Sequence, residues 1–139
     1  MTIFARHTPI RFAHCDAAGL IFYPRFFALM NEMVEDWFAG PLGHSFRVLH
    51  LSDKKGVPTV HLSADFIGPV RLGDELEQTL CVAQLGVSSC RLQHEALIKG
   101  KPVARFDHTI VFVDLCSMKP EAWPPGLRER MASFVEATT

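Results

Sequence analysis

One helical segment with a wide apolar face constrains this chain more than any other feature. Pro24 suits the first position of a helix, and the turn-forming GPLG after Ala39 ends the segment. At about 100° per residue, its large apolar side chains share one broad arc and its acids take the opposite arc. These apolar residues are Phe26, Phe27, Leu29, Met30, Met33, Val34, Trp37 and Phe38. We therefore expect a helix over 24–39 that is covered by a sheet.

The segments before and after this helix are typical of strands. Residues 2–14 are strand-like, and Pro9 there indicates an edge position or a bulge. Later in the chain, apolar and polar residues alternate between short turn signals, which favours an antiparallel sheet and an α+β fold. The predicted strands are 57–70, 75–85, 90–98 and 103–115, and a short helix is predicted over 124–137.

Length and composition limit the possible classes of protein. The chain has 139 residues, which suits a single domain spanning 1–139. A formal net charge of −1 offers no electrostatic footprint for nucleic acid, and no run approaches the roughly 18 apolar residues of a membrane span. The beginning of the chain lacks the apolar core of a signal peptide, and the four cysteines form no CxxC pair. We expect reduced thiols and a cytoplasmic location.

The stretch AHCDAAGLIFYP, residues 13–24, places a carboxylate at a corner of small residues before the helix. Asp16 suits a turn cap, a metal ligand or a working acid or base. His14, Cys15 and Asp16 include metal-ligating types, but neighbours on an extended strand point to opposite faces, so no metal site is expected. Cys15 as a nucleophile would need a partner base, and none is indicated.

The run D-x-x-G, three apolar residues and Y-P resembles the opening of the 4-hydroxybenzoyl-CoA thioesterase family of hotdog-fold proteins. The matching residues are Asp16, Gly19 and Tyr23–Pro24, followed by the aromatic helix. VPTVHLSADFIGPVRLGDELE, residues 57–77, also resembles that family's second strand and the turn after it. The resemblance covers roughly residues 8–115.

The resemblance implies a hotdog fold, in which a curved antiparallel sheet of about five strands wraps a long central helix. It also implies hydrolysis of an acyl-CoA thioester, with no metal or organic cofactor, because coenzyme A is part of the substrate. Members of the family pair as homodimers with continuous sheets and often stack into tetramers. Their active sites lie at the dimer interface, so each site uses residues of two chains.

Three residues match the family's catalytic machinery. Asp16 matches the catalytic aspartate, which either attacks the thioester carbonyl to give a mixed anhydride or deprotonates a water. Tyr23 precedes Pro24, so its backbone N–H lies at the free N-terminus of the helix and, by resemblance, is the oxyanion-hole donor. Gly19 is expected to supply a positive φ or a close approach to substrate.

The substrate-binding candidates are polar residues that lie beyond this motif. Asn31 borders the apolar face of the helix, where it would hydrogen-bond a ring hydroxyl or simply lie on the surface. By resemblance, the second strand carries Thr59 and His61 beside the neighbouring protomer's site. The turn where family members contact the pantetheine arm or nearby phosphates carries Ser88, Ser89 and the adjoining Arg91.

Two functions from different classes follow. The first is an acyl-CoA thioesterase, for which the aromatic helix and Asn31 favour an aryl or arylacetyl group over a short or medium fatty acyl group. The alternative is a non-catalytic hotdog protein that binds acyl-CoA or acyl-carrier protein. Asp16 separates them in principle, because a pure binder has no need for a carboxylate at the thioester.

Overall fold

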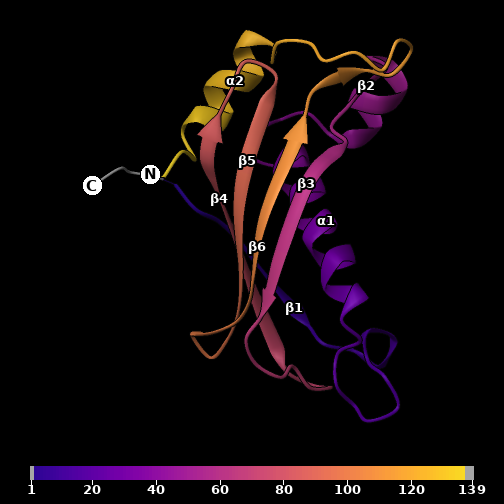
Figure 1. The fold of residues 1–139 in the computed structure, drawn as a ribbon, viewed down its shortest axis with the longest axis vertical. Helices are drawn as coiled ribbons and strands as arrows, with labels where there is room; N and C mark the ends of the chain where they lie inside the picture. Colours follow the sequence, from indigo (N-terminus) through magenta and orange to yellow (C-terminus); the bar gives the residue numbers. More distant parts are fainter. Residues whose placement is uncertain (1, 137–139) are drawn as a thin grey trace.

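A five-stranded sheet forms the body of the protein in the computed structural model, which describes residues 2–136 (Figure 1). The strand order is β1-β4-β5-β6-β3, and every neighbouring pair is antiparallel. The predicted α+β class and antiparallel sheet are therefore confirmed. The strands are β1 (Phe4–Pro9), β3 (Thr59–Phe66), β4 (Glu75–Leu85), β5 (Ser89–Ile98) and β6 (Lys101–Val111).

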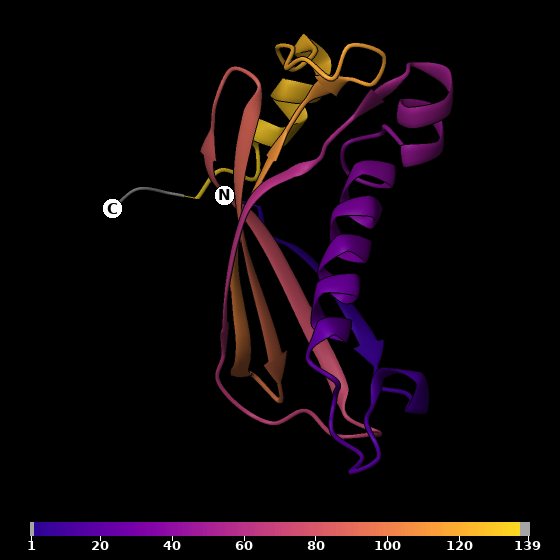
Figure 2. The same ribbon diagram turned by 45° about the vertical axis from the view of Figure 1, so that its right-hand side comes forward.

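Helix α1 (Pro24–Ala39) begins and ends at the predicted residues. Figure 2 shows it running lengthwise along one face of the sheet. Helix α2 (Pro125–Ala132) is shorter than the predicted 124–137, and residue 137 lies outside the described residues. No helix within residues 2–136 is long and apolar enough to cross a membrane. The remaining elements are η1 (Phe12–His14), η2 (Val48–Ser52), β2 (Lys55–Gly56) and β7 (Val113–Asp114).

The apolar face of α1 is buried as its sequence pattern predicts. Its first half packs against the sheet through Phe26, Leu29 and Met30. Its second half packs against the sheet and against α2. Burial of each large apolar side chain contributes about 1.5–3 kcal/mol relative to exposure, so these contacts hold the helix on the sheet. The second half contributes Met33, Val34, Trp37 and Phe38, which cluster with Leu80, Leu92, Ile110, Leu127 and Met131.

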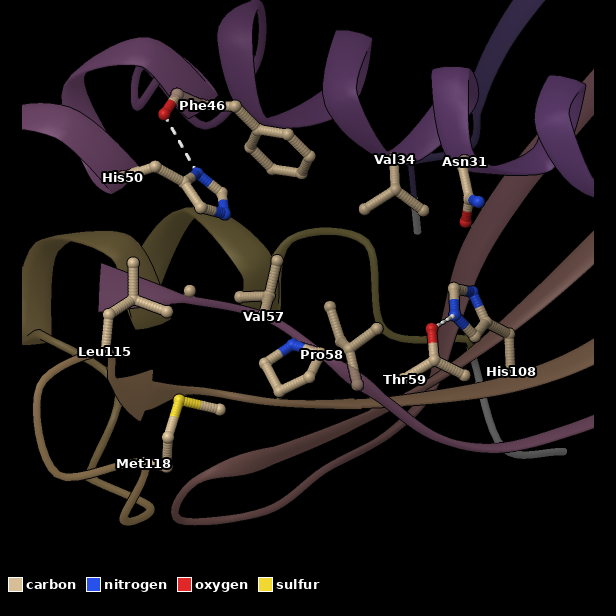
Figure 3. A pocket seen from close by; sticks show the side chains of 12 residues that line it. Asn31, Val34, Phe46, His50, Val57, Pro58, Thr59, His108, Leu115 and Met118 are labelled. Atoms are coloured by element: carbon tan, nitrogen blue, oxygen red, sulfur yellow. Dashed lines mark hydrogen bonds between the residues drawn. The ribbon is translucent and has the colours of Figure 1, made fainter. Parts of the chain in front are cut away.

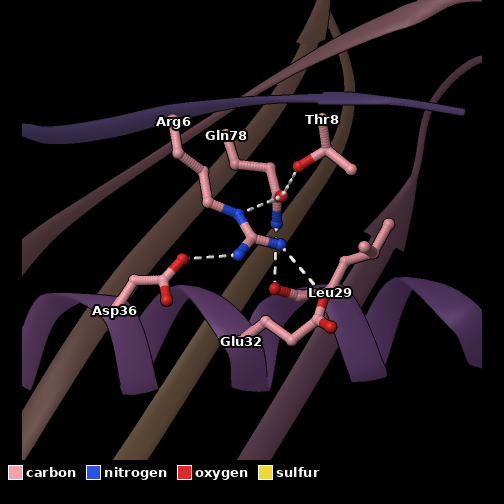
Figure 4. Close-up of polar contacts among 6 residues, drawn as sticks. All are labelled: Arg6, Thr8, Leu29, Glu32, Asp36 and Gln78. Atoms are coloured by element: carbon pink, nitrogen blue, oxygen red, sulfur yellow. Dashed lines mark hydrogen bonds and ion pairs between the residues drawn. The ribbon is translucent and has the colours of Figure 1, made fainter. Parts of the chain in front are cut away.

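A polar cluster fastens β1 to the outer side of α1 (Figure 4). The Arg6 guanidinium donates to Asp36 at 2.7 Å and to Glu32 at 3.1 Å, both on the helix. Its Nε donates to the side-chain oxygen of buried Gln78 on β4 at 3.0 Å. The Gln78 amide in turn donates to the Leu29 carbonyl at 3.1 Å. One arginine therefore links an edge strand, a central strand and the helix.

The two edges of the sheet differ in how much they are covered. Pro9 ends β1, which lies at one edge, as its sequence predicts. Strand β3 forms the other edge and is exposed along most of its length. Its apolar side chains are open to solvent, with Val60 59% and Phe66 48% exposed. Such an edge is a template for pairing with another strand.

A β-bulge lies in β3 between Thr59 and His61. Strict alternation predicts that these two residues share a face, and that Val60 shares the face of Leu62. The extra residue at the bulge reverses this relation. Thr59 therefore lies on the α1 side with Leu62, whereas His61 lies on the opposite face.

Three predicted strands end earlier than expected. The strand predicted over 2–14 stops at Pro9, and the strand predicted over 57–70 stops at Phe66. The strand predicted over 103–115 leaves the sheet after Val111, because Val111 pairs with Ser89, the first residue of β5. No β5 residue remains to pair with the following segment, and β7 pairs with β2 instead.

Candidate active site

Asp16 lies in a tight turn between β1 and α1. Its Oδ1 accepts hydrogen bonds from the N–H groups of Ala18 at 2.9 Å and Leu20 at 3.2 Å. Its own N–H donates to the Leu20 carbonyl at 2.8 Å. The prediction that Asp16 caps a turn is therefore confirmed for its Oδ1 atom. The side chain is exposed, and within residues 2–136 its Oδ2 has no hydrogen-bond partner, so one carboxylate oxygen is free to react.

Gly19 completes this turn with a φ of +76°. A Cβ added at Gly19 would meet nothing within 4 Å. The positive φ predicted for Gly19 is therefore confirmed, since a side chain would have space within the protein but a strained backbone, and a close approach to substrate stays a prediction. The Gly19 carbonyl accepts from the Leu72 N–H at 2.9 Å, which ties the turn to the loop before β4.

The chain returns from this turn to the start of α1. Cys15 and Ile21 form an antiparallel bridge, and the Phe22 N–H donates to the His14 carbonyl at 2.9 Å. Tyr23 comes next and is the N-cap of α1, with Pro24 at the first helical position. Among the described residues, no acceptor takes the Tyr23 N–H, so this donor is open at the positive end of the helix dipole.

A pocket with a volume of about 260 Å³ lies farther along α1 (Figure 3). Its walls come from α1, η2 and the nearby ends of β3 and β6. Polar side chains gather at one end, where Asn31 and His108 point toward one another beside Thr59. The other wall residues are mostly apolar: Val34, Phe46, Val57, Pro58, Ile110, Leu115 and Met118, with His50 among them.

Behind the polar end, a hydrogen-bonded chain of three side chains runs from Thr59, on the exposed strand β3, to two buried histidines. Thr59 Oγ1 lies 2.7 Å from His108 Nε2, and His108 Nδ1 lies 3.3 Å from His94 Nε2. His94 is 5% exposed and His108 is 1% exposed. Burial lowers the pKa of His94 to about 3, with a smaller contribution from His108, and lowers the pKa of His108 to about 4. Both imidazoles are therefore neutral at pH 7.

The other predicted binding residues lie away from this pocket. His61 and Arg91 both pair with Thr109, so they form a row across the outer face of the sheet. Arg91 is held by Asp107, with Nε 2.9 Å from Oδ1, and this contact lowers the pKa of the Asp107 carboxyl. Arg91 thus has a structural partner whether or not it also contacts substrate.

Ser88 lies in the turn from β4 and precedes Ser89, which is the first residue of β5. Their carbonyls accept from the Phe112 N–H at 2.8 Å and from the Trp123 Nε1–H at 3.0 Å. These backbone bonds anchor the segment after β6. The structure therefore brings the predicted site residues together in two groups, with Asp16, Gly19 and Tyr23 in one and Asn31 and Thr59 in the other.

Sequence reasoning missed His94 and His108. Both occupy inward positions on strands whose other inward side chains are apolar, such as Leu92 on β5 and Ile110 on β6. A histidine at an apolar position of an alternating strand was the available signal. A buried polar group needs a partner, and two histidines on neighbouring strands can supply one for each other.

Within residues 2–136, no three His, Cys, Asp or Glu side chains gather where they could hold a metal ion. All four cysteines of the sequence lie in this part of the chain and are free thiols.

Comparisons with known proteins identify the family to which the chain belongs. The family model of the thioesterase-like superfamily matches residues 10–131. A 1,4-dihydroxy-2-naphthoyl-CoA hydrolase from Synechococcus elongatus is 30% identical over 131 residues, which are 93% of this chain and 92% of that protein. The match is to the superfamily, and the narrower 4-hydroxybenzoyl-CoA thioesterase family stays a prediction.

Solved structures of thioesterases share the fold. A 1,4-dihydroxy-2-naphthoyl-CoA thioesterase from Synechocystis has a TM-score of 0.86 at 22% identity, covering 94% of this chain and 96% of that chain. A gentisyl-coenzyme A thioesterase has a TM-score of 0.81 at 24% identity, covering 90% of this chain and 99% of that chain. The family model spans most of the sequence and the Synechococcus relative matches nearly all of it, so the chain belongs to the thioesterase-like superfamily and is a thioester hydrolase with a hotdog fold.

Proposed function

We propose that the protein hydrolyses the thioester of an aryl-CoA whose ring carries hydroxyl groups. The observation that carries this proposal is the open Tyr23 N–H at the start of α1, reached by the same turn that leaves one Asp16 oxygen free. The similarity to 1,4-dihydroxy-2-naphthoyl-CoA hydrolases supports the substrate class. A polar end in an otherwise apolar pocket supports it independently.

The reaction starts at the free oxygen of Asp16. In one route, this oxygen attacks the thioester carbon, the C–S bond breaks, and coenzyme A leaves as a thiolate that solvent protonates. Water then cleaves the mixed anhydride, which releases the carboxylic acid and restores Asp16. In the other route, Asp16 removes a proton from a water that attacks the carbon directly, the C–S bond breaks, and the proton passes from Asp16 to the departing coenzyme A thiolate. Neither route needs a metal or an organic cofactor.

In both routes the carbonyl oxygen becomes negative. The Tyr23 N–H, at the positive end of the α1 dipole, supplies an oriented hydrogen bond to this oxygen. Because the bond strengthens as charge develops, it lowers the barrier more than it stabilises the bound substrate.

The acyl pocket and the reactive turn are apart within one chain. Asn31 lies eight residues beyond Tyr23, which is about 12 Å along a helix. The two groups also lie at opposite ends of β3, since Thr59 begins this strand while the Tyr23 ring contacts Phe66, its last residue, at 6.0 Å. Those ends are about 23 Å apart.

A second copy closes this gap. Antiparallel pairing of β3 with the β3 of another protomer sets Thr59 of one chain beside Phe66 of the other. The pocket of one protomer then lies beside the Asp16 turn of its partner. We propose this homodimer, with shared active sites and a continuous sheet that curves around the central α1 helices, and its association into a tetramer. Four free cysteines suit a cytoplasmic protein.

A hydrolysis screen tests the proposed function. The panel is 1,4-dihydroxy-2-naphthoyl-CoA, 4-hydroxybenzoyl-CoA, benzoyl-CoA and hexanoyl-CoA, assayed with wild type and Asp16→Asn. We expect aryl-CoA turnover to fall by about 10²-fold or more in Asp16→Asn. Asp53→Asn, which alters an exposed carboxylate at the end of η2, is the matched control and should retain wild-type rates.

Three results decide the proposal. Failure of wild type to hydrolyse any aryl-CoA would refute the function. Full activity in Asp16→Asn would refute the mechanism. Rapid quenching during a single turnover separates the two routes, because only nucleophilic attack leaves the acyl group bound to Asp16.

A further inference from the structure

The proposed chemistry leaves the hydrogen-bonded chain Thr59–His108–His94, with its two buried histidines, without a role. It begins at the polar end of the pocket, where Thr59 and His108 both line the cavity, and it runs inward to His94. The Nδ1 atom of His94 is buried without a hydrogen-bond partner in the described residues. A buried polar network that is incompletely satisfied is costly, so its retention at a pocket points to a task there.

The unpaired Nδ1 atom of His94, at the inner end of this hydrogen-bonded series, decides which atoms donate and which accept within it. If Thr59 donated to His108, His108 would donate to His94, and His94 Nδ1 would carry a buried proton with no acceptor. In the opposite direction His94 donates through Nε2, His108 donates through Nε2 to Thr59, and only a lone pair of His94 Nδ1 stays unpaired. We assign this second direction, because orphaned buried N–H groups are the rarer defect.

This direction determines what Thr59 offers to a ligand. Its oxygen already accepts the His108 N–H at 2.7 Å, so its own proton is free to be donated. Asn31 faces His108 across the same end of the pocket (Figure 3), and its amide both donates and accepts hydrogen bonds. The polar end therefore presents a fixed donor beside an adaptable amide.

The rest of the pocket suits an aromatic ring. Its walls beyond the polar end are mostly apolar, and its volume is about 260 Å³. A cavity of about 150 Å³ accommodates benzene, so this pocket has room for a fused bicyclic ring. With both buried imidazoles neutral, the polar end fits an uncharged ring hydroxyl better than a carboxylate.

We propose that Thr59 is a specificity-determining residue that donates its hydroxyl proton to a ring oxygen of the acyl group. His108, backed by His94, is the positioning residue that holds Thr59 as a donor. This inference rests on the proposed function and deepens it, since it names the group on the substrate that the pocket selects: an oxygen on the side of the ring distal to the thioester.

The test compares two substrates that differ by this oxygen alone, 1,4-dihydroxy-2-naphthoyl-CoA and 1-hydroxy-2-naphthoyl-CoA. We expect wild type to prefer the dihydroxy substrate in kcat/KM by roughly tenfold, the value of one buried neutral hydrogen bond. Thr59→Val removes the hydroxyl at nearly constant volume and should abolish most of this preference. Thr59→Ser keeps the hydroxyl and should retain it.

The same ratio of kcat/KM between the two substrates tests the positioning role of the histidines. His108→Leu should lose the preference, mainly through KM, whereas His108→Gln keeps an N–H donor and should restore part of it. Thr109→Val is the matched control, because Thr109 lies on the opposite face of β6 beside His61 and should keep the wild-type ratio. Equal rates of wild type on both substrates, or equal losses on both in Thr59→Val, would overturn the inference while the thioesterase function stands.

A spectroscopic measurement decides the assignment even if the histidine variants do not fold. Nitrogen chemical shifts of wild-type protein should show both His94 and His108 protonated at Nε2. Protonation of both rings at Nδ1 instead would make Thr59 the donor to His108 and would refute the proposal. If wild type hydrolyses no aryl-CoA at all, the proposed function fails, which the two-substrate ratio distinguishes from failure of this inference.

Discussion

At the scale of single residues, the turn before α1 engages only one oxygen of the Asp16 carboxylate. Asp16 Oδ1 holds the N–H groups of Ala18 and Leu20, which keeps the carboxylate in one orientation. Its second oxygen has no hydrogen-bond partner among the described residues, and the proposed reaction starts there. A catalytic group gains from such orientation, because a fixed geometry removes the entropy of finding it. The same bonds explain why Gly19 is needed to close the turn.

Tyr23→Pro tests the proposed role of the Tyr23 N–H as oxyanion donor. Tyr23 has a φ of −50°, close to the value that proline imposes, so the substitution removes the N–H with little change of backbone. We expect kcat to fall by about 10²–10³-fold. Tyr23→Phe keeps the N–H and removes only the phenol hydroxyl, so its kcat should stay close to wild type. Comparable losses in both variants would assign the effect to the ring.

The buried histidines make stability depend on pH. Because burial lowers the pKa of His94 to about 3 and of His108 to about 4, unfolded chains bind protons below pH 6.5 that the folded protein does not. The free energy of unfolding should therefore fall as pH drops from about 6.5 toward 4. In His94→Leu this slope should be smaller by about 1.4 kcal/mol per pH unit, measured by urea unfolding. An unchanged slope in His94→Leu would contradict this prediction.

At the scale of elements, Arg6 is the polar link between β1 and α1. Its side chain is 19% exposed, and its partners Glu32 and Asp36 are more than half exposed, so solvent weakens the two ion pairs. The bond to buried Gln78 is the more valuable contact, since its loss leaves the Gln78 carbonyl oxygen with only the Thr8 hydroxyl, 3.3 Å away, as a donor. We expect Arg6→Met to lower the free energy of unfolding by about 1–2 kcal/mol. Urea denaturation measures this change.

The matched control for Arg6 is Arg105→Met. Arg105 pairs with Glu95 on the outer face of the sheet, where its side chain is 56% exposed. That variant should lose less than about 0.5 kcal/mol. Equal losses in the two variants would show that Gln78 contributes nothing beyond a surface ion pair.

The exposed edge strand β3 is the element on which the proposed assembly depends. Leu62→Glu places a charge on this edge, where a paired strand would have to bury it. We expect sedimentation to show loss of the dimer and the tetramer in favour of a monomer, with loss of hydrolysis in the same samples. Val87→Glu is the control, because Val87 is 74% exposed at the turn between β4 and β5, away from this edge. A stable, active Leu62→Glu monomer would contradict the shared site.

At the scale of the whole molecule, a shared site predicts complementation between inactive variants. Asp16→Asn lacks the reactive carboxylate, and Thr59→Trp fills the pocket. In a mixed dimer, one site combines the intact Asp16 of one chain with the intact pocket of the other. Equal mixing after reversible unfolding should therefore restore about a quarter of wild-type activity, since half of the dimers are mixed and each holds one good site.

Complementation also separates the shared site from a site within one chain. If Asp16 and the pocket of the same chain acted together, each chain of the mixed dimer would carry one defect and the mixture would stay inactive. The assay needs only the two variants, refolded singly and together, and one aryl-CoA substrate. Its outcome bears on the dimer of the proposed function and not on the superfamily.

Local signals predicted the parts of this protein that depend on neighbouring residues. The helix over 24–39 begins and ends where Pro24 and the following glycine turn indicated. The positive φ of Gly19 and the edge position of the strand ending at Pro9 were likewise readable. Each rests on steric or hydrogen-bonding preferences within a few residues, so no distant contact had to be known. The catalytic roles of Asp16 and Tyr23 stay predictions.

Only the tertiary structure decided which side chains share the pocket. The bulge in β3 arises from pairing with β6 and turns Thr59 toward α1, while alternation alone had grouped it with His61. His94 and His108 meet because β5 and β6 pair in one register, although fourteen positions separate them in sequence. Periodicity describes one strand at a time, whereas a pocket depends on the register between strands, which is set by the packing of the whole sheet against α1.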